Sequence, residues 1–318
     1  MSASTQTRAD EIEPEVNRFV QEVIEQSKAL IAGRTLTLDE RRDLAETVRE
    51  PWSAGGPKMG STQDVALPDS TCKLRIHIPE GGPGKGVMLY IHGGGWMLFS
   101  VKTHDRLMRE YAAAAGCAVV GLDYALAPEN PFPAALNDVI AGVNWIRAHG
   151  AAHGLCTDRL LMGGDSAGGN LTLAATKKLR DDGADLPNGI LVNYGALDTE
   201  HRSSHKRYDG APFMLDAAEM DEYWQAYLGE GDRQNPYARV MLGDLSQLPP
   251  THLCIAECDI LLDENKALMK LLKVAGVEVT GKIYPGATHS FLEAVSISPV
   301  ARQAIADSAA WMKRILAR

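Results

Sequence analysis

The sequence has few cysteines and fewer basic than acidic residues. Its five cysteines form no CxxC pair among 318 residues. An odd number of scattered cysteines predicts neither a disulfide framework nor a thiolate zinc site. The chain has 32 Lys and Arg against 41 Asp and Glu, which gives a formal net charge of -9. This acidic balance argues against nucleic acid or an anionic membrane as a partner.

Long apolar runs are missing as well. The chain starts MSASTQTRADEIEPE, which is polar and acidic, whereas a signal peptide has a basic and then an apolar region. No later run approaches the length that spans a membrane. Scattered cysteines are typical of a reducing compartment, so we expect a cytoplasmic protein with no membrane partner.

Apolar residues are nevertheless plentiful, at 45% of the chain, which is enough for a large core. Short apolar runs typical of strands begin at Cys72, Gly86, Cys117, Arg159, Gly189, Thr251 and Val277. Helical patterns cover residues 104–115, 133–149, 167–181, 261–274 and 300–316. This alternation predicts an α/β fold, with a mainly parallel sheet covered by helices on both faces.

Three segments depart from the alternation. Residues 11–32 have the apolar spacing of an amphipathic helix, and residues 47–61 are rich in Gly, Pro and Ser and predict a loop. Residues 197–248 contain a helical pattern at 217–228 but no convincing strand. An insertion beyond the carboxyl edge of a parallel sheet is where a substrate lid lies, and the leading helix can join it.

The strongest motif is the G-x-S-x-G pattern Gly164-Asp165-Ser166-Ala167-Gly168, directly after a predicted strand and before a predicted helix. Such a strand-to-helix turn exposes a nucleophilic serine in a strained conformation. The positive end of the following helix favours a developing oxyanion. The alternative is that small residues merely pack a tight turn.

A second motif, His92-Gly93-Gly94-Gly95-Trp96, also follows a predicted strand. Consecutive glycines allow their N–H groups to converge on an oxyanion. The alternative is a surface turn. A phosphate-binding loop fits less well, because no Gly-Lys-Ser or Gly-Lys-Thr follows.

A histidine base and an orienting carboxylate are expected on loops after later strands. His289 follows the strand that starts at Val277, and Asp259 follows the preceding one. Asp263 and Glu264 suit the first turn of the next helix better. The order Ser166, Asp259, His289 is the order of the α/β-hydrolase triad.

The other eight histidines include one candidate metal pair. His201 and His205 have the i,i+4 spacing of zinc ligands, but no HExxH motif surrounds them. We therefore predict no metal site. A structural or surface position is the simpler interpretation of the remaining candidates that we considered, namely His77, His149, His153 and His252.

Taken together, the motifs resemble the hormone-sensitive-lipase family of α/β-hydrolases, including the bacterial carboxylesterases. The segments that carry the resemblance are HGGGW, DYALAPENPFPAALND, GGDSAGGNL, AECDILLDEN and YPGATHSF, in this order along the chain. The resemblance implies an α/β-hydrolase domain over residues 56–318. It also implies a helical cap formed by residues 1–55, with a contribution from residues 197–248.

The same resemblance implies an oxyanion hole made by backbone N–H groups. The glycines of HGGG and the residue after the nucleophile supply them in the family, which corresponds here to Gly94, Gly95 and Ala167, with Gly93 as a less direct donor. The predicted catalytic residues are Ser166, Asp259 and His289.

The predicted function is that of a serine carboxylesterase, which hydrolyses short- to medium-chain esters through an acyl-enzyme and needs no cofactor. A lactonase, an amidase or an acyltransferase would use the same triad. A rival from another class is a binding protein on this scaffold, such as the plant gibberellin receptor, which lacks the catalytic histidine. We expect a small-molecule ester as the partner, and the sequence also allows a homodimer.

Bulky residues near the motifs are candidates for the substrate pocket. Trp96 follows the oxyanion glycines, and the insertion contributes Phe213, Met214 and Trp224, with Tyr223 and Tyr227 nearby. The alternative for each is that it packs the core of the cap itself.

Overall fold

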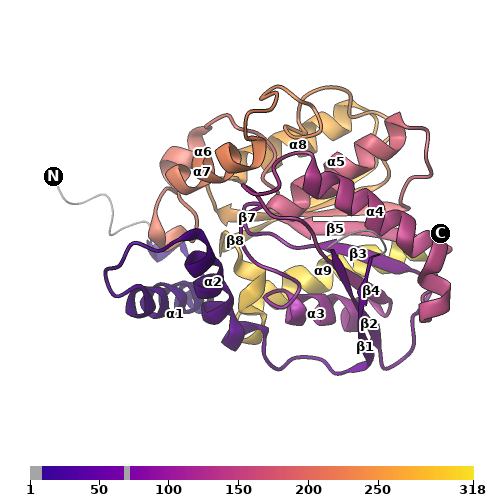
Figure 1. The fold of residues 1–318 in the computed structure, drawn as a ribbon, viewed down its shortest axis with the longest axis horizontal. Helices are drawn as coiled ribbons and strands as arrows, with labels where there is room; N and C mark the ends of the chain where they lie inside the picture. Colours follow the sequence, from indigo (N-terminus) through magenta and orange to yellow (C-terminus); the bar gives the residue numbers. More distant parts are fainter. Residues whose placement is uncertain (1–8, 68–71) are drawn as a thin grey trace.

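The computed structural model describes residues 9–67 and 72–318. A single eight-stranded sheet runs through this part of the chain, in the order β1-β2-β4-β3-β5-β6-β7-β8 (Figure 1). Its strands are β1 (Met59–Ala66), β2 (Lys73–Pro79), β3 (Val87–Ile91), β4 (Ala118–Asp123), β5 (Leu160–Asp165), β6 (Gly189–Asn193), β7 (Thr251–Cys258) and β8 (Val279–Thr288). The six strands β3 to β8 are all parallel to one another. At one edge of the sheet, β2 is antiparallel to both of its neighbours, β1 and β4.

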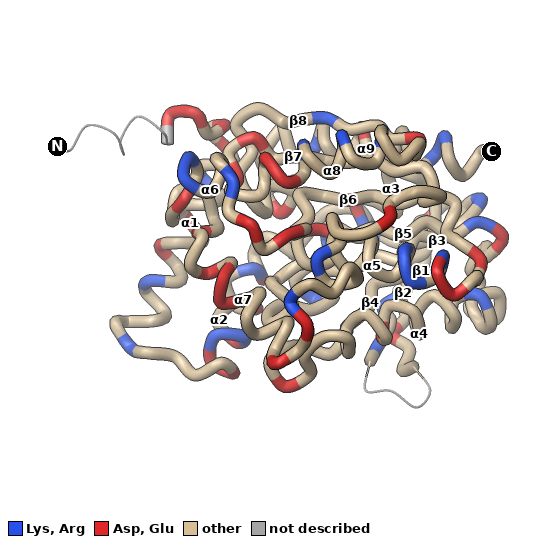
Figure 2. The backbone as a smooth tube through the Cα atoms, turned by 90° about the horizontal axis from the view of Figure 1, so that it is seen from above, with Lys and Arg blue, Asp and Glu red and all other residues tan. Residues whose placement is uncertain are grey.

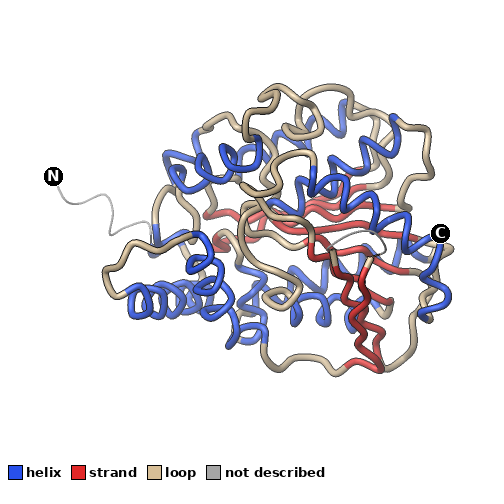
Figure 3. Tube along the Cα trace, viewed as in Figure 1, coloured by secondary structure: helices blue, strands red, loops and turns tan. Residues whose placement is uncertain are grey.

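Helices cover both faces of this sheet (Figures 1 and 3). One face carries α3 (Asp105–Ala115) and α9 (Pro299–Leu316), and the other carries α4 (Ala134–His149), α5 (Ala167–Asp181) and α8 (Leu262–Val274). Strands β3, β5 and β6 are buried along their whole length, as strands covered on both faces must be. The predicted α/β architecture is therefore confirmed.

The parallel strands bring three distant segments to one edge of the sheet. Ser166 follows β5, Asp259 follows β7, and His289 follows β8. Because parallel neighbours have their carboxyl ends at the same edge, residues 123 positions apart can meet there.

The prediction of a loop over residues 47–61 is correct only for residues 54–58. Helix α2 (Leu38–Ser53) extends through the first half of this range, and β1 begins in the second half. The helix persists past Pro51 because Ala45, Val48 and Trp52 form its buried face, and the Trp52 ring meets Phe19 edge-on at 4.8 Å. Packing thus outweighs the preference of Pro51 for a break in the helix, whereas Gly55 and Gly56 lie in the loop that follows.

The insertion contains α6 (Ser203–Arg207), the short helix η3 (Ala211–Phe213) and α7 (Ala217–Leu228), and no strand. It lies beside α1 (Pro14–Ile31) and α2, and α1 packs against η3 (Figure 1). Residues 1–8 of the expected N-terminal cap lie outside the described residues. Short 3-10 helices complete the described elements: η1 (Ala9–Glu11), η2 (Gly150–His153) and η4 (Phe291–Ser296).

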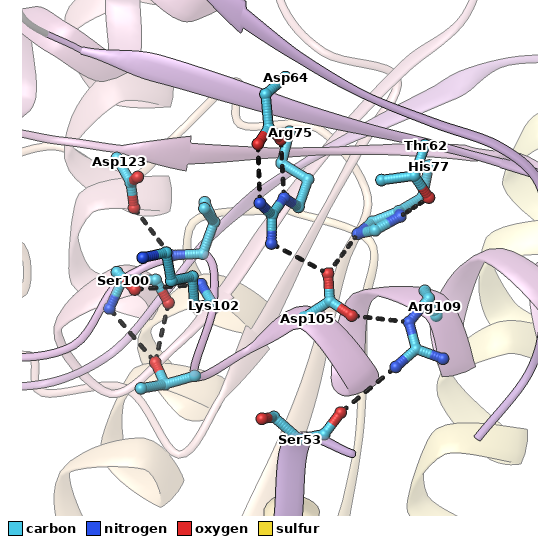
Figure 4. A network of polar contacts seen from close by, with 12 residues as sticks. Ser53, Thr62, Asp64, Arg75, His77, Ser100, Lys102, Asp105, Arg109 and Asp123 are labelled. Carbon is cyan, nitrogen blue, oxygen red and sulfur yellow. Dashed lines mark hydrogen bonds and ion pairs between the residues drawn. The ribbon is translucent and has the colours of Figure 1, made fainter. Parts of the chain in front are cut away.

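A network of ion pairs at the start of α3 attaches the end of α2 to the sheet (Figure 4). Asp105 contacts Arg75 and His77 of β2, each at 3.3 Å, and Arg109 at 2.8 Å. Burial alone would raise the pKa of Asp105, but His77 and Arg109 lower it to about 2. Arg109 also donates to the backbone carbonyl of Ser53, the last residue of α2, and to those of Gly55 and Pro57 just after it.

Further arginines attach α2 to the rest of the molecule. Charged residues of both signs occur along this helix (Figure 2). Arg41 pairs with Glu222 of α7, and Arg42 donates to Glu129 at 2.7 Å and to the carbonyl of Met97 at 2.9 Å. None of the helices within the described ranges combines the length and apolar character needed to cross a membrane.

Candidate active site

Ser166 lies at the turn between β5 and α5 with φ 51° and ψ -118°. A positive φ is costly for any residue except glycine, so this backbone is strained. The strain directs the serine side chain out of the turn, at the amino-terminal end of α5. This is the geometry that the G-x-S-x-G pattern predicts.

The flanking glycines are needed because another strand comes close to the turn. A Cβ atom on Gly164 or on Gly168 would collide with the backbone carbonyl of Ile91, the last residue of β3. The two glycines of the motif therefore allow β3 to pack closely against the turn that carries Ser166.

The three predicted catalytic residues form one hydrogen-bonded series. The Oγ atom of Ser166 lies 2.9 Å from Nε2 of His289, and Nδ1 of His289 lies 2.8 Å from Oδ2 of Asp259. The other carboxylate oxygen of Asp259 accepts a hydrogen bond from the backbone N–H of Leu261. An ionised carboxylate can only accept hydrogen bonds, so Asp259 favours the tautomer in which Nδ1 of His289 carries the proton. Nε2 is then free to accept the proton of Ser166.

The surroundings of His289 alter its basicity. Burial alone would lower its pKa, but the charge of Asp259 and the hydrogen bond to it, together with Asp165 and Glu219, raise the pKa above the usual 6.5. The ring is therefore a stronger base than free imidazole, while it stays hydrogen-bonded to Ser166.

The glycine loop, residues 93–95, follows β3, and two of its three glycines line the cavity beside Ser166. Gly94 and Gly95 have φ values of 102° and 59°, which favour glycine, and both line the same cavity as Ser166 and His289. Ala167 is the first residue of α5, where backbone N–H groups lack helical partners. Gly93 is turned differently, because its carbonyl accepts hydrogen bonds from His92 and Tyr124 and its Cα faces Asp165.

A buried polar cluster lies behind the serine. Asp165 accepts a hydrogen bond from Tyr90 at 2.7 Å and contacts Nε2 of His104 at 3.3 Å. Burial alone would raise the pKa of Asp165, but His104 and Tyr90 hold it below the usual range. The ring of His92 stacks on Tyr124, and burial with the nearby His104 lowers the pKa of His92 to about 4. This cluster connects the glycine loop to the turn that carries Ser166.

The competing acidic residues have other contacts. Asp263 accepts a hydrogen bond from the backbone N–H of Ser204, and Glu264 accepts one from Leu197. Both lie in the first turn of α8, as predicted, but Glu264 is fully buried, and burial raises its pKa well above the usual range. Neither contacts the ring of His289.

The other candidate histidines also lie outside this series. His201 pairs with Asp221, and the ring of His205 stacks on that of His201. Within residues 9–67 and 72–318, no three His, Cys, Asp or Glu side chains are grouped as metal ligands would be.

A cavity of about 670 Å³ opens above the serine. Its floor includes Gly94, Gly95, Ser166 and His289. Three segments of the chain contribute its roof. They are α1 with the turn after it, α2, and the stretch from η3 to α7. The apolar members of the roof are Val23, Ile24, Ile31, Leu36, Leu44, Ala45, Val48, Ala211, Met214, Leu215 and Met220.

The predicted pocket residues are largely misplaced. Met214 lines the cavity, but Trp96, Phe213 and Trp224 do not. Trp96 is fully buried and stacks on Tyr227 at 4.3 Å between ring centroids, with Trp224 at 4.5 Å. Phe213 instead packs edge-on against Tyr208. These aromatics form the core under the insertion, since large apolar rings gain most from complete burial.

Several cavity residues were not predicted from the sequence. The apolar face of α1 was recognisable, but nothing in a single sequence shows that it faces Ser166. The family resemblance implies cap helices within residues 1–55, but local periodicity does not reveal α2, because its many charged residues hide the buried positions. Glu219 lies three residues after the N-cap Asp216, where an acidic residue is expected for helix capping alone.

This arrangement can perform acyl transfer. It holds a serine, a base that can take its proton, and backbone N–H groups near the position of a developing oxyanion. The cavity gives a small substrate access to these groups.

Known proteins share this fold and much of this sequence. Residues 88–293 match the family model of the alpha/beta hydrolase fold. The acetyl esterase of Salmonella schwarzengrund is 33% identical over 277 residues, which cover 86% of this chain and 85% of that protein.

Solved structures agree with this assignment. The esterase of Pyrobaculum calidifontis has a TM-score of 0.87 at 29% identity, with 96% of this chain and 99% of that chain covered. An esterase from the bacterial hormone-sensitive lipase family has a TM-score of 0.84 at 30% identity, with the same coverage. The chain therefore belongs to the α/β-hydrolase fold family, within its hormone-sensitive-lipase group.

Proposed function

We propose that this protein is a serine carboxylesterase in which Ser166 is the nucleophile, His289 the general base and Asp259 the residue that orients it. The observation that carries this proposal is the hydrogen-bonded series of the three residues at the floor of the cavity. The acetyl esterases and esterases among its relatives support ester hydrolysis over lactone, amide or transfer chemistry.

The reaction follows from the geometry. His289 takes the proton of Ser166 as Oγ attacks the ester carbonyl, and Asp259 stabilises the imidazolium that forms. His289 then gives this proton to the leaving alcohol. Water then attacks the acyl-enzyme carbonyl while His289 takes its proton, and His289 returns that proton to Oγ of Ser166 as the acid leaves.

The oxyanion is held by the backbone N–H groups of Gly94, Gly95 and Ala167. Their positions next to Ser166, at the positive end of α5, support this role. Gly93 is kept as a less direct donor, because it is not among the residues that line the cavity.

We further propose that α1, α2 and the insertion act as a cap that limits the length of the substrate. A mostly apolar cavity of about 670 Å³ supports a preference for short to medium acyl chains. Each methylene that no longer fits forfeits about 0.8 kcal/mol of burial.

A series of p-nitrophenyl esters from acetate to palmitate tests the proposed function. We expect kcat/KM to peak at short or medium chains, and Ser166→Ala to abolish turnover in a protein with an unchanged circular dichroism spectrum. A fluorophosphonate should add one adduct, on Ser166. Adducts confined to another serine, or rates that still rise at palmitate, would contradict the proposal.

The assembly and location of the protein are also proposals. Strand β8 forms one edge of the described sheet, with Ile283 partly exposed on it, and Val274 nearby is 88% exposed. We propose that two copies associate at this edge, which light scattering during gel filtration tests. A cytoplasmic location and the lack of nucleic-acid binding remain predictions of the sequence, to be checked by cell fractionation and a gel-shift assay.

A further inference from the structure

One carboxylate of the roof lies close to the catalytic residues. Glu219 of α7 lines the same cavity as Ser166 and His289, and it is among the groups that raise the pKa of His289. Most of the roof around it is apolar, including Met214, Leu215 and Met220.

Tyr223 holds this carboxylate in place. Its hydroxyl donates to Oε1 of Glu219 at 2.6 Å, one helical turn away. The Tyr223 ring lies directly against the glycine loop, because a Cβ atom on Gly95 would collide with it. Burial raises the pKa of the Tyr223 phenol well above 10, so it remains a donor. The orientation of Glu219 is thus tied to the oxyanion loop.

The second oxygen of Glu219 has no such partner. Among the described residues, no donor lies within hydrogen-bond distance of Oε2, although it belongs to a half-buried side chain that faces the cavity. The nearby cations already have carboxylate partners, since Arg41 pairs with Glu222 and Arg49 with Glu293.

The other acidic residue of the roof has a different task. Asp216 lines the cavity too, but its Oδ1 accepts from the backbone N–H of Glu219 and so caps α7. Oε2 of Glu219 is not among the buried atoms that lack a partner, so it is open to the cavity, where a donor on the substrate can reach it. Burial raises the pKa of Glu219, and Tyr223, Arg41 and Arg49 only partly counteract this effect.

We propose that Glu219, oriented by Tyr223, accepts a hydrogen bond from a hydroxyl or ammonium group of the substrate. The preferred substrates are then small esters whose acid or alcohol carries such a donor, rather than plain alkyl esters. This inference rests on the proposed esterase function and specifies its substrate class. Pockets that bind a substrate donor discriminate strongly against analogues that lack it, because their own polar groups are then left unpaired.

The test compares esters of nearly equal size. On the acid side, methyl 3-hydroxypropanoate and methyl 3-aminopropanoate are compared with methyl butanoate, and on the alcohol side 2-hydroxyethyl acetate is compared with propyl acetate. Each kcat/KM is measured in a pH-stat at neutral pH. The readout is the ratio of donor ester to alkyl ester, because differences in intrinsic reactivity cancel between variants.

We expect Glu219→Met to lower this ratio about tenfold on the side of the ester that faces Glu219. Glu219→Gln keeps an acceptor oxygen without its charge, so it should preserve the ratio for the hydroxyl ester and lower it for the ammonium ester. Tyr223→Phe should lower both, because it releases the carboxylate. Asp221→Asn, on the exposed side of the same helix, is the matched control and should leave every ratio unchanged.

Equal ratios in the wild-type protein, Glu219→Met and Tyr223→Phe would overturn the inference, while turnover of the alkyl esters would leave the proposed function intact. Wild-type protein that hydrolyses none of these esters would overturn the proposed function itself. Thermal unfolding of each variant shows whether it is folded. If Glu219→Met does not fold, the ratios of Glu219→Gln and Tyr223→Phe decide.

Discussion

The floor of the cavity and its roof are held in place by different means. Residues of the floor follow directly from β3, β5 and β8, and backbone geometry fixes them: a strained φ at Ser166 and positive φ values at Gly94 and Gly95. The roof is attached to the body of the molecule through side chains, by ion pairs of α2 with Glu129 and Glu293 and by contacts of α1 with β8 and η4. Because the backbone fixes the floor, the catalytic reaction can stay the same while substitutions in the roof, which side chains hold in place, change which substrate is bound.

The largest expected effect comes from changing the floor's catalytic series. Asp259→Asn should lower kcat by about 10⁴-fold, because the amide favours the wrong tautomer of His289. Steady-state kinetics on p-nitrophenyl acetate measure this effect. Asp263→Asn is the matched control, since Asp263 accepts a hydrogen bond from the Ser204 backbone and pairs with Lys266, away from His289. If Asp263→Asn were the crippling change instead, the roles assigned to the two residues would be wrong.

The next effect lies where floor and roof meet. Gly95→Ala should lower kcat about 100-fold, because the new methyl group collides with the Tyr223 ring and displaces an oxyanion donor. Gly183→Ala is the control. Its φ of 69° would strain an alanine in the same way, but no atom lies within 4 Å of the added methyl group. The control should cost about 1 kcal/mol of stability and no activity. Equal activity of the two variants would argue against Gly95 in the oxyanion hole.

A moderate effect is expected from the roof's buried ion pair. Arg49 of α2 contacts Glu293 at 3.1 Å, with side chains 11% and 6% exposed, and lies over the ring of Phe99. Arg49→Met should lower the free energy of unfolding by about 3 kcal/mol, because it leaves Glu293 buried and unpaired.

Urea unfolding measures this loss, and the double variant with Glu293→Gln should recover part of it. Arg41→Met breaks the more exposed pair with Glu222 and should cost at most about 1 kcal/mol. Equal losses of unfolding free energy in Arg49→Met and Arg41→Met would show that the burial of an ion pair does not determine its contribution to stability.

The smallest effect concerns pH. His289 must be neutral to accept a proton, and its pKa is raised above 6.5 by Asp259, Asp165 and Glu219 against the effect of burial. The value of kcat/KM should therefore fall as the pH drops through a midpoint above 6.5. A pH profile between 4 and 9 measures the midpoint. A profile that stays flat down to pH 4 would exclude a histidine base.

The sequence alone determined the fold class and the residues of the catalytic series, for local reasons. Apolar runs alternating with helical patterns imply a parallel sheet. The G-x-S-x-G spacing marks the strand-to-helix turn at Ser166, even though the contact that requires its glycines comes from Ile91 of β3, far away in the sequence. Chain order along the sheet then limits which histidine and which carboxylate can reach the serine.

Only the tertiary structure decided what surrounds the substrate. Trp96 and Trp224 were candidates for the pocket but pack together beneath it, whereas Glu219 had no distinguishing signal and lines the cavity. Helix α2 was hidden because its buried face carries few apolar residues and becomes recognisable only where it packs against α1, α3 and η4. Such positions depend on contacts between segments far apart in the chain, and local periodicity contains no information about which segments meet.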